Sequence, residues 1–462
     1  MPGQGLHSLS PVNFCRSKVV RIQNFMNQAH RIVVVGGGAG GLELVTALGN
    51  TLGKHGKAHV TLIDRARAHV WKPLLHIIAA GSMDPGEHQV NYLAQAKWNH
   101  FDFRLGEMIG LDRQAQLVHL GEMRDEEGRQ ITAPRSIPYD TLVICLGSVT
   151  NDFGTPGAAQ YAVPLDTPTE AVRFNRRLLN ACIRAQSQDG PLRPGQLHVA
   201  IIGAGATGSE LAAELHSTAR QMVAYGLDRI DPQRDMRIML IEAASRILPA
   251  LPERMSAATE ELLKGLGVEV MTNCRVAEVR EDGVQLSSGT FLPAELVVWS
   301  AGVKAPDFLR DIDGLETNRA NQLVVEQTLQ TTRDPNIFSF GDCAACPLDE
   351  TGRLVPPRAQ AAHQQASHMV GQIKRRMAGE ALKPYHYRDF GSLVSLGRYS
   401  TVGNLMGSLV GKNMFIEGYF ARLMYRSLYK MHEVAVSGWW RTIVDTLARS
   451  LSSRVEPTVK LH

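Results

Sequence analysis

The chain has 462 residues, of which 44% are hydrophobic and 20% are charged, and it contains 42 glycines. A chain of this length is too long to fold around one ordinary hydrophobic core, so we expect two or three domains. The composition excludes a fibrous or disordered chain and is typical of a globular α/β protein. The net charge of +4 is too small to indicate nucleic-acid binding, and six irregularly spaced cysteines do not make a disulfide scaffold.

Residues 1–29 contain no acidic residue and no apolar core of signal-peptide length. They favour a disordered extension, with Met26 as a candidate true start. The alternative is an organellar transit peptide, because the segment is basic and contains serine. Nothing in it has the pattern of a core.

A dinucleotide-binding turn is predicted directly after the first strand. The β-branched run at residues 31–35 is typical of a buried parallel strand, and a G-x-G-x-x-G motif follows it at once. Its glycines are Gly36, Gly38 and Gly41. They permit a tight turn, close approach to a pyrophosphate and close packing of the next helix, whose N-terminal N–H groups face the phosphates. A strand at 59–63 ends in Asp64, placed to accept from a ribose hydroxyl.

The same pattern occurs a second time. A strand at 198–202 precedes a second glycine motif, formed by Gly203, Gly205 and Gly208. A helix follows, and a strand at 237–241 ends in Glu242. A carboxylate there accepts from a free 2′-hydroxyl and repels a 2′-phosphate, which favours NADH over NADPH. Two such motifs in the same context are far more specific than one.

A later strand at 336–340 leads into Gly341 and Asp342, and an Asp there can bind a polyol such as the ribitol of FAD. Cys343 and Cys346 follow, in C-x-x-C spacing. This pair is either a redox dithiol or a packed, non-exchanging pair, and its position favours the second. Two strand-like runs, 142–147 and 296–302, are expected where the chain crosses between domains.

The last 72 residues carry nine Lys/Arg against four Asp/Glu and eight aromatic side chains. Two amphipathic helices are predicted, at 418–436 and from Trp439 onward, with apolar stripes beside rows of Arg and Lys. The first stripe comprises Phe420, Met424, Leu428 and Met431, and the second comprises Trp439, Trp440, Ile443, Val444, Leu447 and Leu451. No apolar run reaches the ~18 residues of a spanning helix. The pattern favours interfacial helices on an anionic lipid surface; packing on the chain's own body or on a homodimer partner is the alternative.

Together these residues resemble the two-dinucleotide-binding flavoprotein superfamily, in which an NAD domain is inserted into a split FAD domain. A narrower similarity, to the bacterial type II NADH dehydrogenases, runs from about Arg31 to His462. It is carried by residues 69–76 (HVWKPLLH), 251–252 (LP), 328–334, 356–364 (PPRAQAAHQ) and 460–462. The resemblance implies FAD at the first motif, NADH at the second, and Gly341 and Asp342 at the flavin ribitol. It divides the chain into FAD-binding segments 30–160 and 304–390, an NAD-binding domain 161–303 and a membrane-associating region 391–462.

The implied activity is a peripheral NADH:quinone oxidoreductase on the cytoplasmic side of the cell inner membrane. It passes hydride from NADH to FAD and then two electrons to a membrane quinone, without proton pumping. The cofactor carries the chemistry, so no nucleophile or metal is expected. The alternatives are a soluble NADH-dependent disulfide or peroxide reductase, and a slow-turnover flavoprotein that senses NADH.

Three residues are candidate catalytic groups. In the family, an acid such as Glu210 lies near the nicotinamide. A carboxylate in the first turn of a helix is, however, also stabilised by the helix dipole. Gln360 and Gln364, four residues apart on a predicted helix, would share one face and donate to a quinone carbonyl, unless that face is only solvated. His363 between them is interpreted as a structural or exposed histidine.

Overall fold

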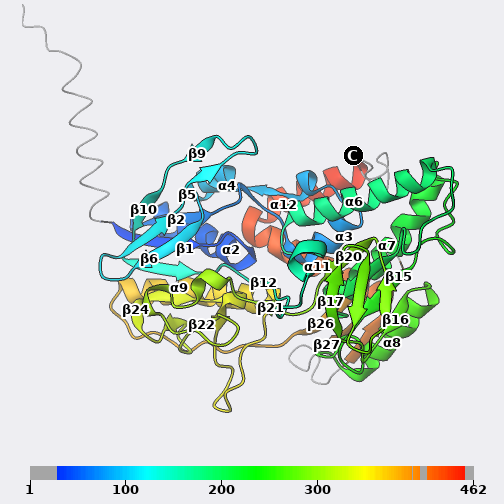
Figure 1. Ribbon diagram of the computed structural model, residues 1–462. Coiled ribbons are helices and arrows are strands. Elements are labelled where there is room, and N and C mark those ends of the chain that lie inside the picture. The colour runs from blue at the N-terminus through cyan, green and yellow to red at the C-terminus, as the bar shows by residue number, and fades with distance from the viewer. Residues whose placement is uncertain (1–28, 398, 406–413, 453–462) are drawn as a thin grey trace, which may run out of the picture.

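The computed structural model describes residues 29–397, 399–405 and 414–452 (Figure 1). Its largest sheet has six strands in the order β23-β24-β11-β1-β2-β5. The bounds are β1 His30–Val35, β2 Ala58–Asp64, β5 Asp102–Leu105, β11 Thr141–Ile144, β23 Gln330–Thr331 and β24 Asp334–Ser339. All neighbours pair in parallel except β23 with β24. Because β24 comes from late in the chain and pairs with β11, two distant segments build one sheet.

Helices and a small antiparallel sheet bury both faces of this sheet. Alternate residues of β1 enter two different cores, with Ile32 and Val34 in one and Val33 and Val35 in the other. The first core contains side chains of α2 (Ala39–Leu48) and α9 (Ala359–Met377). The second is closed by β6 (Met108–Asp112), β7 (Leu117–Leu120) and β10 (Arg135–Pro138). Burial on both sides explains why β1 is a continuous apolar run.

The second parallel sheet has the order β13-β20-β14-β15-β16. Its strands are β13 Val163–Pro164, β14 Val199–Ile202, β15 Ile238–Ile241, β16 Glu269–Met271 and β20 Leu296–Trp299. It lies between β11 and β24 in the sequence, so the expected insertion of one domain into the other is confirmed. The runs 142–147 and 296–302 belong largely to the sheets, as β11 and β20. The crossing itself is the antiparallel pair that follows them, β12 (Val149–Thr150) with β21 (Val303–Lys304).

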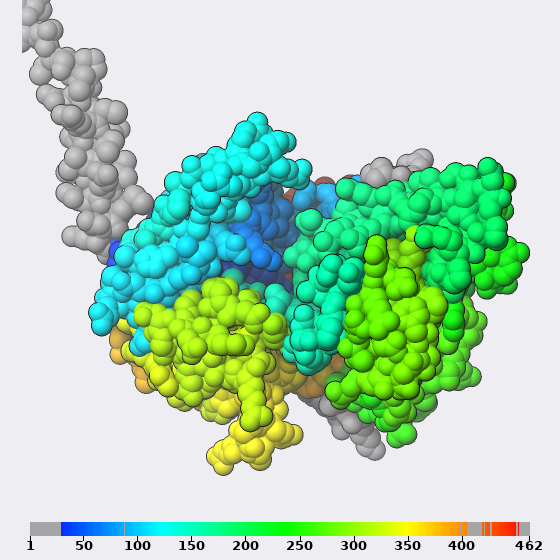
Figure 2. Space-filling model, in the orientation of Figure 1, coloured from blue at the N-terminus to red at the C-terminus, as the bar shows by residue number. Residues whose placement is uncertain are grey.

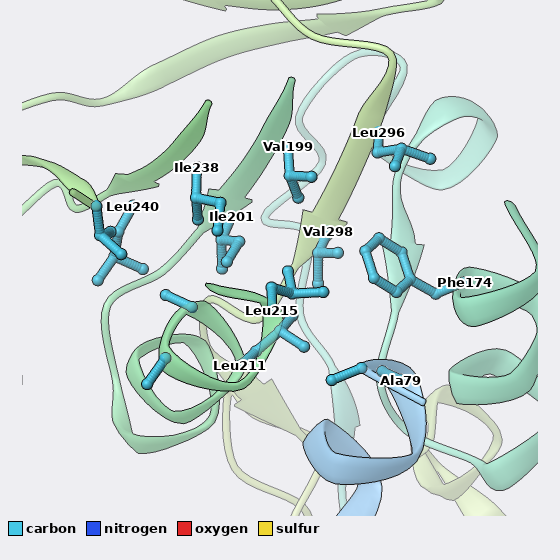
Figure 3. Close-up of a cluster of buried hydrophobic side chains, with 14 of the residues drawn as sticks. Ala79, Phe174, Val199, Ile201, Leu211, Leu215, Ile238, Leu240, Leu296 and Val298 are labelled. Atoms are coloured by element: carbon cyan, nitrogen blue, oxygen red, sulfur yellow. The ribbon is translucent and has the colours of Figure 1, made fainter. Parts of the chain in front are cut away.

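The core of the inserted domain combines three helices with its sheet (Figure 3). Leu211 and Leu215 of α7 (Ala206–Ala224) and Phe174 of α6 (Pro168–Ser187) pack on β14, β15 and β20. Ala79 of α3 (Leu75–Ala79) joins this core, although α3 comes from the first FAD segment of the chain. α8 (Glu253–Gly265) and the antiparallel strands β17 (Val276–Arg280), β18 (Gly283–Leu286) and β19 (Phe291–Pro293) complete the domain.

The C-terminal region begins with a sheet that the sequence did not predict. β26 (Gly391–Leu396), β27 (Ser400–Leu405) and β28 (Met414–Glu417) are antiparallel. Val394, Leu396 and Val402 enter the core of the inserted domain, which docks this sheet there. The two predicted helices follow, as α11 (Tyr419–Ser437) and α12 (Trp439–Ser452). Within the described ranges, every helix is too short or too polar to cross a bilayer. The expected extension lies outside the described residues, apart from Ala29.

Candidate active site

The two glycine motifs have the same backbone geometry. Gly36 and Gly203 turn the chain at φ +107° and +98°, a region that side chains disfavour. A Cβ on Gly41 would lie 1.8 Å from the Gly36 carbonyl oxygen, and one on Gly208 would lie 2.1 Å from that of Gly203. The first helical turn therefore packs so closely on each strand end that only glycine fits.

Both helix N-termini have backbone donors available to a ligand. Gly38 and Gly205 are the N-caps of α2 and α7, and neither helix has a side-chain cap. A Cβ on either glycine would meet nothing within 4 Å, so the space beside each N-terminus is open. Free N–H groups at the positive end of a helix dipole, with room beside them, fit the pyrophosphate of a dinucleotide.

Asp64 and Glu242 have equivalent contacts at the strand ends. Asp64 accepts backbone N–H groups of Gly37 and Ala66 at 2.6 and 2.7 Å. Glu242 accepts those of Ala204 and Ala244, both at 2.9 Å. Each carboxylate is thus fixed beside its own glycine turn, where a ribose would lie. The crossover from α2 to β2 contains an extra π-helical turn, Gly49–Gly53.

One cavity of about 1680 Å³ joins the two nucleotide sites. It lies between the two lobes of Figure 2, where the split domain is blue, cyan and yellow and the inserted domain is green. It brings together residues that the sequence placed in separate motifs, namely Gly36, Gly38, Gly41, Asp64, Gly203, Gly205, Glu210, Glu242, Gly341, Asp342, Gln360 and Gln364. Asp342 accepts the Ser148 hydroxyl at 2.8 Å, and burial raises the pKa of its carboxyl. A partly buried acid that already accepts a hydroxyl hydrogen fits the ribitol chain of a flavin.

Glu210 is buried, and the carboxyl of Glu214 lies near it. Glu210 Oε1 accepts the Ser395 N–H at 2.9 Å, and its carboxyl hydrogen-bonds to the Tyr425 hydroxyl. Burial raises the pKa of Glu210 to about 8, and it lowers that of His76 to about 4. The 3.5 Å between His76 Nδ1 and Glu210 Oε2 is within ion-pair range. At neutral pH, however, both groups are uncharged, so this is a contact between neutral side chains.

The amides of Gln360 and Gln364 bind backbone rather than a free surface. Gln360 donates to the Gly391 carbonyl at 3.0 Å and accepts the Phe390 N–H at 3.2 Å. Gln364 donates to and accepts from the backbone of Arg388, at 2.8 and 3.0 Å. They share one helix face that lines the cavity, as expected, and they join α9 to the segment entering β26. Gln360 also donates to Asp389 at 3.3 Å, so a quinone carbonyl bound to its amide would displace one of two bonds, whereas Gln364 uses one of its two amide N–H groups on Arg388.

Several residues of the cavity wall were not predicted from the sequence, among them Glu43, Tyr425 and His432. Glu43 is buried in α2, where it contacts histidines of α9 and α11. Tyr425 and His432 come from α11, whose Met424, Leu428 and Met431 also line the cavity. Three residues of the apolar stripe that was expected to face lipid therefore line the cavity instead. Glu43 could have been found, because it stands two residues after the last glycine of its motif, as Glu210 does.

The cysteine pair is enclosed by the fold. Cys343 and Cys346 are 0% and 1% exposed and unbonded to each other. Burial raises the pKa of Cys343, and it raises that of Cys346 to about 12. A buried thiol with so little thiolate is a poor nucleophile, which supports the packed, non-exchanging pair over the redox dithiol.

Comparison with known proteins places this architecture in a family. Residues 30–366 match the pyridine nucleotide-disulphide oxidoreductase family. The type II NADH:quinone oxidoreductase of Haemophilus influenzae is 42% identical over 444 residues, which cover 93% of this chain and 99% of that protein. The chain belongs to the type II NADH:quinone oxidoreductases.

Other type II NADH:quinone oxidoreductases match over similar lengths. NdhA of Mycobacterium tuberculosis is 30% identical over 92% of this chain and 87% of its own. NDH2 from Plasmodium falciparum, solved in complex with NADH, has the same fold, with a TM-score of 0.77 at 18% identity over 94% of this chain and 100% of that one. Membership of the family confirms the predicted enzyme class and its cofactors, FAD and NADH.

Proposed function

We propose that this chain is a peripheral membrane enzyme that oxidises NADH through bound FAD and reduces a membrane quinone without translocating protons. The observation that carries the proposal is the single cavity, which both glycine turns, both ribose-side acids and the wall formed by α11 line together. FAD supplies the chemistry, since it accepts hydride from NADH and returns two electrons to the quinone. Because one cavity serves donor and acceptor, the one proton that each turnover consumes is taken up at that cavity, and no proton has to cross the membrane.

The chain's own residues bind and orient the two nucleotides. The N-terminus of α2, with Asp64 and Asp342, holds FAD, and the N-terminus of α7, with Glu242, holds NADH. Glu210 lies on the first turn of α7 and forms the cavity wall beside the nicotinamide. Its neutral carboxyl can donate a hydrogen bond there, whereas an ionised one could only accept. Gln360 and Gln364 are assigned to the quinone side, where an amide N–H of either residue would donate to a quinone carbonyl.

The membrane-facing surface is assigned to α12 and α4 (Tyr92–Asn99). Trp439, Trp440 and Leu447 of α12 are 75%, 76% and 62% exposed, and Leu93 of α4 is 66% exposed. The Arg441 guanidinium lies 4.0 Å from the Trp98 ring centroid, so the two helices form one surface with a cation at its centre. Large exposed aromatics beside cations suit the headgroup region of an anionic bilayer. We place this surface on the cytoplasmic side of the cell inner membrane.

α12 carries less unpaired positive charge in the structure than its sequence indicates. Arg449 is held by Glu433 at 3.1 Å and also pairs with Asp445, so it contributes little free charge. Apolar insertion of Trp439 and Trp440 therefore carries more of the proposed binding than charge does. A homodimer that covers this surface is the competing proposal, and analytical ultracentrifugation with and without lipid vesicles distinguishes the two.

The proposed reaction is tested by the choice of electron acceptor. Purified holoenzyme is assayed for NADH oxidation with a soluble ubiquinone, with ferricyanide, with a disulfide and with hydrogen peroxide. We expect rapid reduction of quinone and ferricyanide only. Preferred reduction of the disulfide or peroxide would replace the proposal with a reductase, and slow turnover with every acceptor would indicate an NADH sensor. In vesicles that contain a pH-sensitive dye, quinone reduction should produce no proton gradient.

The cysteine pair provides an independent test against the reductase alternative. Cys343→Ala and Cys346→Ala, singly and together, should leave NADH:quinone turnover within a few fold, because neither thiol reaches the cavity as a thiolate. A loss of about 10²-fold with normal FAD content would contradict this and favour a dithiol mechanism.

A further inference from the structure

Two glutamates hold equivalent positions in the two dinucleotide motifs. Glu43 and Glu210 each come two residues after the last glycine of their motif. Both are buried and line the cavity, and each contacts a side chain of α11. Glu210 contacts Tyr425 and Glu43 contacts His432, seven residues further along, so one face of α11 reaches both carboxyls. The proposed function uses Glu210 and leaves Glu43 without a role.

Glu43 lies between two histidines. Nδ1 of His363, on α9, is 2.6 Å from Glu43 Oε2, and Nδ1 of His432 is 2.7 Å from Glu43 Oε1. Nε2 of His432 is 3.0 Å from Nε2 of His69, at the end of β3 (Ala68–His69). The Trp71 ring packs on His432 with centroids 4.1 Å apart. Side chains from β3, α9 and α11 thus converge on one carboxyl of α2.

The contacts restrict where the protons lie. Burial, and then the charge of His432, lower the pKa of His69 to about 3, so its ring is neutral and uses its N–H on the Gly37 backbone. His69 Nε2 is then an acceptor, and Nε2 of His432 carries a hydrogen. The contact between His432 Nδ1 and Glu43 shares one further proton. This pair is therefore a carboxylate with an imidazolium or a carboxylic acid with a neutral ring.

His363 connects this cluster to the cavity. Its side chain is 44% exposed, against 7% for Glu43 and 5% for His432. The hydrogen bond that His363 donates to Glu43 raises the pKa of His363 against the effect of burial. Burial raises the pKa of Glu43, but the hydrogen bonds from both histidines lower it by more. His363 Nδ1 can stay bonded to Glu43 in either charge state, so Nε2 can gain or lose a proton without breaking the contact.

We propose that Glu43, with His363 and His432, stores the solvent proton that each turnover consumes and supplies it to the quinone. The inference rests on the proposed function and assigns a further step to it. NADH, one proton and a quinone give NAD⁺ and a quinol, and the hydride accounts for two electrons and one of the two quinol protons. His363 Nε2 takes the other proton from solvent as the electrons enter the cavity and releases it to the quinone oxygen. Glu43 compensates the added charge.

The first test separates proton supply from electron transfer. Glu43→Gln keeps a hydrogen-bonding amide between the histidines but cannot carry the charge. At about pH 8 we expect its NADH:quinone kcat to fall by about 10²-fold, the scale of acid–base catalysis, with KM within a few fold and partial recovery near pH 6. NADH:ferricyanide kcat, which needs electrons only, should change by less than about threefold. The matched control is His368→Gln, also on α9 but bonded to the Lys383 carbonyl, and it should behave as wild type.

The second test needs no turnover. The midpoint potential of the bound flavin is measured against pH in the holoenzyme. If the cluster takes up a proton on reduction, the potential of the wild type falls more steeply with pH than that of Glu43→Gln. This comparison tests the proton store even if the wild type reduces no quinone, an outcome that would reject the proposed function alone.

Two outcomes would overturn the inference. If Glu43→Gln loses kcat equally with quinone and with ferricyanide, and the pH dependence of the flavin midpoint potential does not change, Glu43 is a structural residue that joins α2, α9 and α11. If Glu43→Gln has the same NADH:quinone kcat as the wild type, and the same dependence of the flavin midpoint potential on pH, another group supplies the proton. If Glu43→Gln loses FAD, His363→Gln and His432→Gln decide between the same outcomes, because each removes one histidine and leaves the carboxyl.

Discussion

Glu210 and Glu242 both belong to the inserted domain, yet their surroundings give the two carboxyls different tasks. Glu210 is enclosed by Tyr425, His76 and the Ser395 backbone, so burial keeps a proton on it near neutral pH. Glu242 faces the backbone N–H groups of the glycine turn, where it can accept a ribose hydroxyl. One residue type thus serves as a buried neutral group and as the proposed nucleotide ligand, and only the environment distinguishes them.

Glu210 should make stability depend on pH in a defined direction. Its folded-state pKa of about 8 lies above the unfolded value, so the folded state binds more protons between about pH 4 and pH 8. Stability from this group is present below that window and is lost as the pH rises through it. We expect Glu210→Gln to gain stability relative to wild type as the pH rises from about 5 to about 9. Thermal unfolding of the holoenzyme at several pH values measures this, with Glu261→Gln, an exposed acid on α8, as control. A difference that does not vary with pH would contradict it.

Glu242 should set the choice of nicotinamide. We expect Glu242→Gln to narrow the preference for NADH over NADPH by about tenfold or more, because a 2′-phosphate no longer meets a carboxylate. The measurement is kcat/KM for both cofactors with one electron acceptor. An unchanged ratio would mean that Glu242 does not lie at the adenosine ribose.

At the scale of elements, the two C-terminal helices differ in what they contact, although the sequence predicted that both lie on a lipid surface. α11 packs against α2 and β27, buries Ala421, His432 and Val436, and forms the cavity wall. α12 packs on α11 and exposes its tryptophans. The amphipathic pattern is similar in both helices, but α11 buries one face against α2 and β27, whereas the described side chains of α12 are mostly exposed.

Removal of α12 alone should release the enzyme from membranes. A chain that ends at Gly438 keeps Tyr425 and His432, so FAD content and NADH:ferricyanide activity should survive while turnover with a long-chain quinone falls. Flotation with anionic and neutral vesicles at low and high salt is the measurement, since each cation near an anionic surface contributes about 1 kcal/mol. Equal binding to neutral vesicles at high salt would indicate purely apolar insertion.

A second truncation controls for the first. A chain that ends at Gly418 also loses α11 and both of its contacts to the buried glutamates, and we expect it to lose FAD. If the Gly438 truncation loses FAD as well, or if the intact chain binds no vesicle, α12 belongs to the core or to a dimer interface.

At the scale of the whole molecule, the two lobes meet around a cavity that FAD is expected to fill. Removal of FAD should therefore lower the stability of both lobes, although most of its contacts are to one of them. A ligand at about 100 times its Kd stabilises the folded state by about 2.7 kcal/mol. We expect the apoprotein to unfold several degrees lower by calorimetry and to recover when FAD is added back. Recovery of only one of two separate transitions would show that the lobes unfold independently.

Much of the fold could be predicted from the sequence because its signals are local. A β-branched run, a glycine turn and a helix start lie within ten residues of one another, and each is fixed by steric rules of the backbone. The strands at 31–35, 59–63, 198–202 and 237–241 were therefore placed to within one residue, and the second dinucleotide domain was correctly inserted in the first. The three-stranded sheet after Gly391 was missed, because it is short and its burial comes from the inserted domain.

The site divides in the same way. The two glycine turns, the acids Asp64 and Glu242 and the candidate ribitol-binding Asp342 could all be located from the sequence, since each stands at a strand end beside its own glycines. The contacts of Glu43 with His363 and His432 depend on the folded chain, because these histidines lie 320 and 389 positions further along the sequence than Glu43. The tertiary structure also decided that the amides of Gln360 and Gln364 bind backbone and that α11 lines a cavity. These properties depend on which surfaces are brought together, and a periodic pattern records that a face is apolar without recording what covers it.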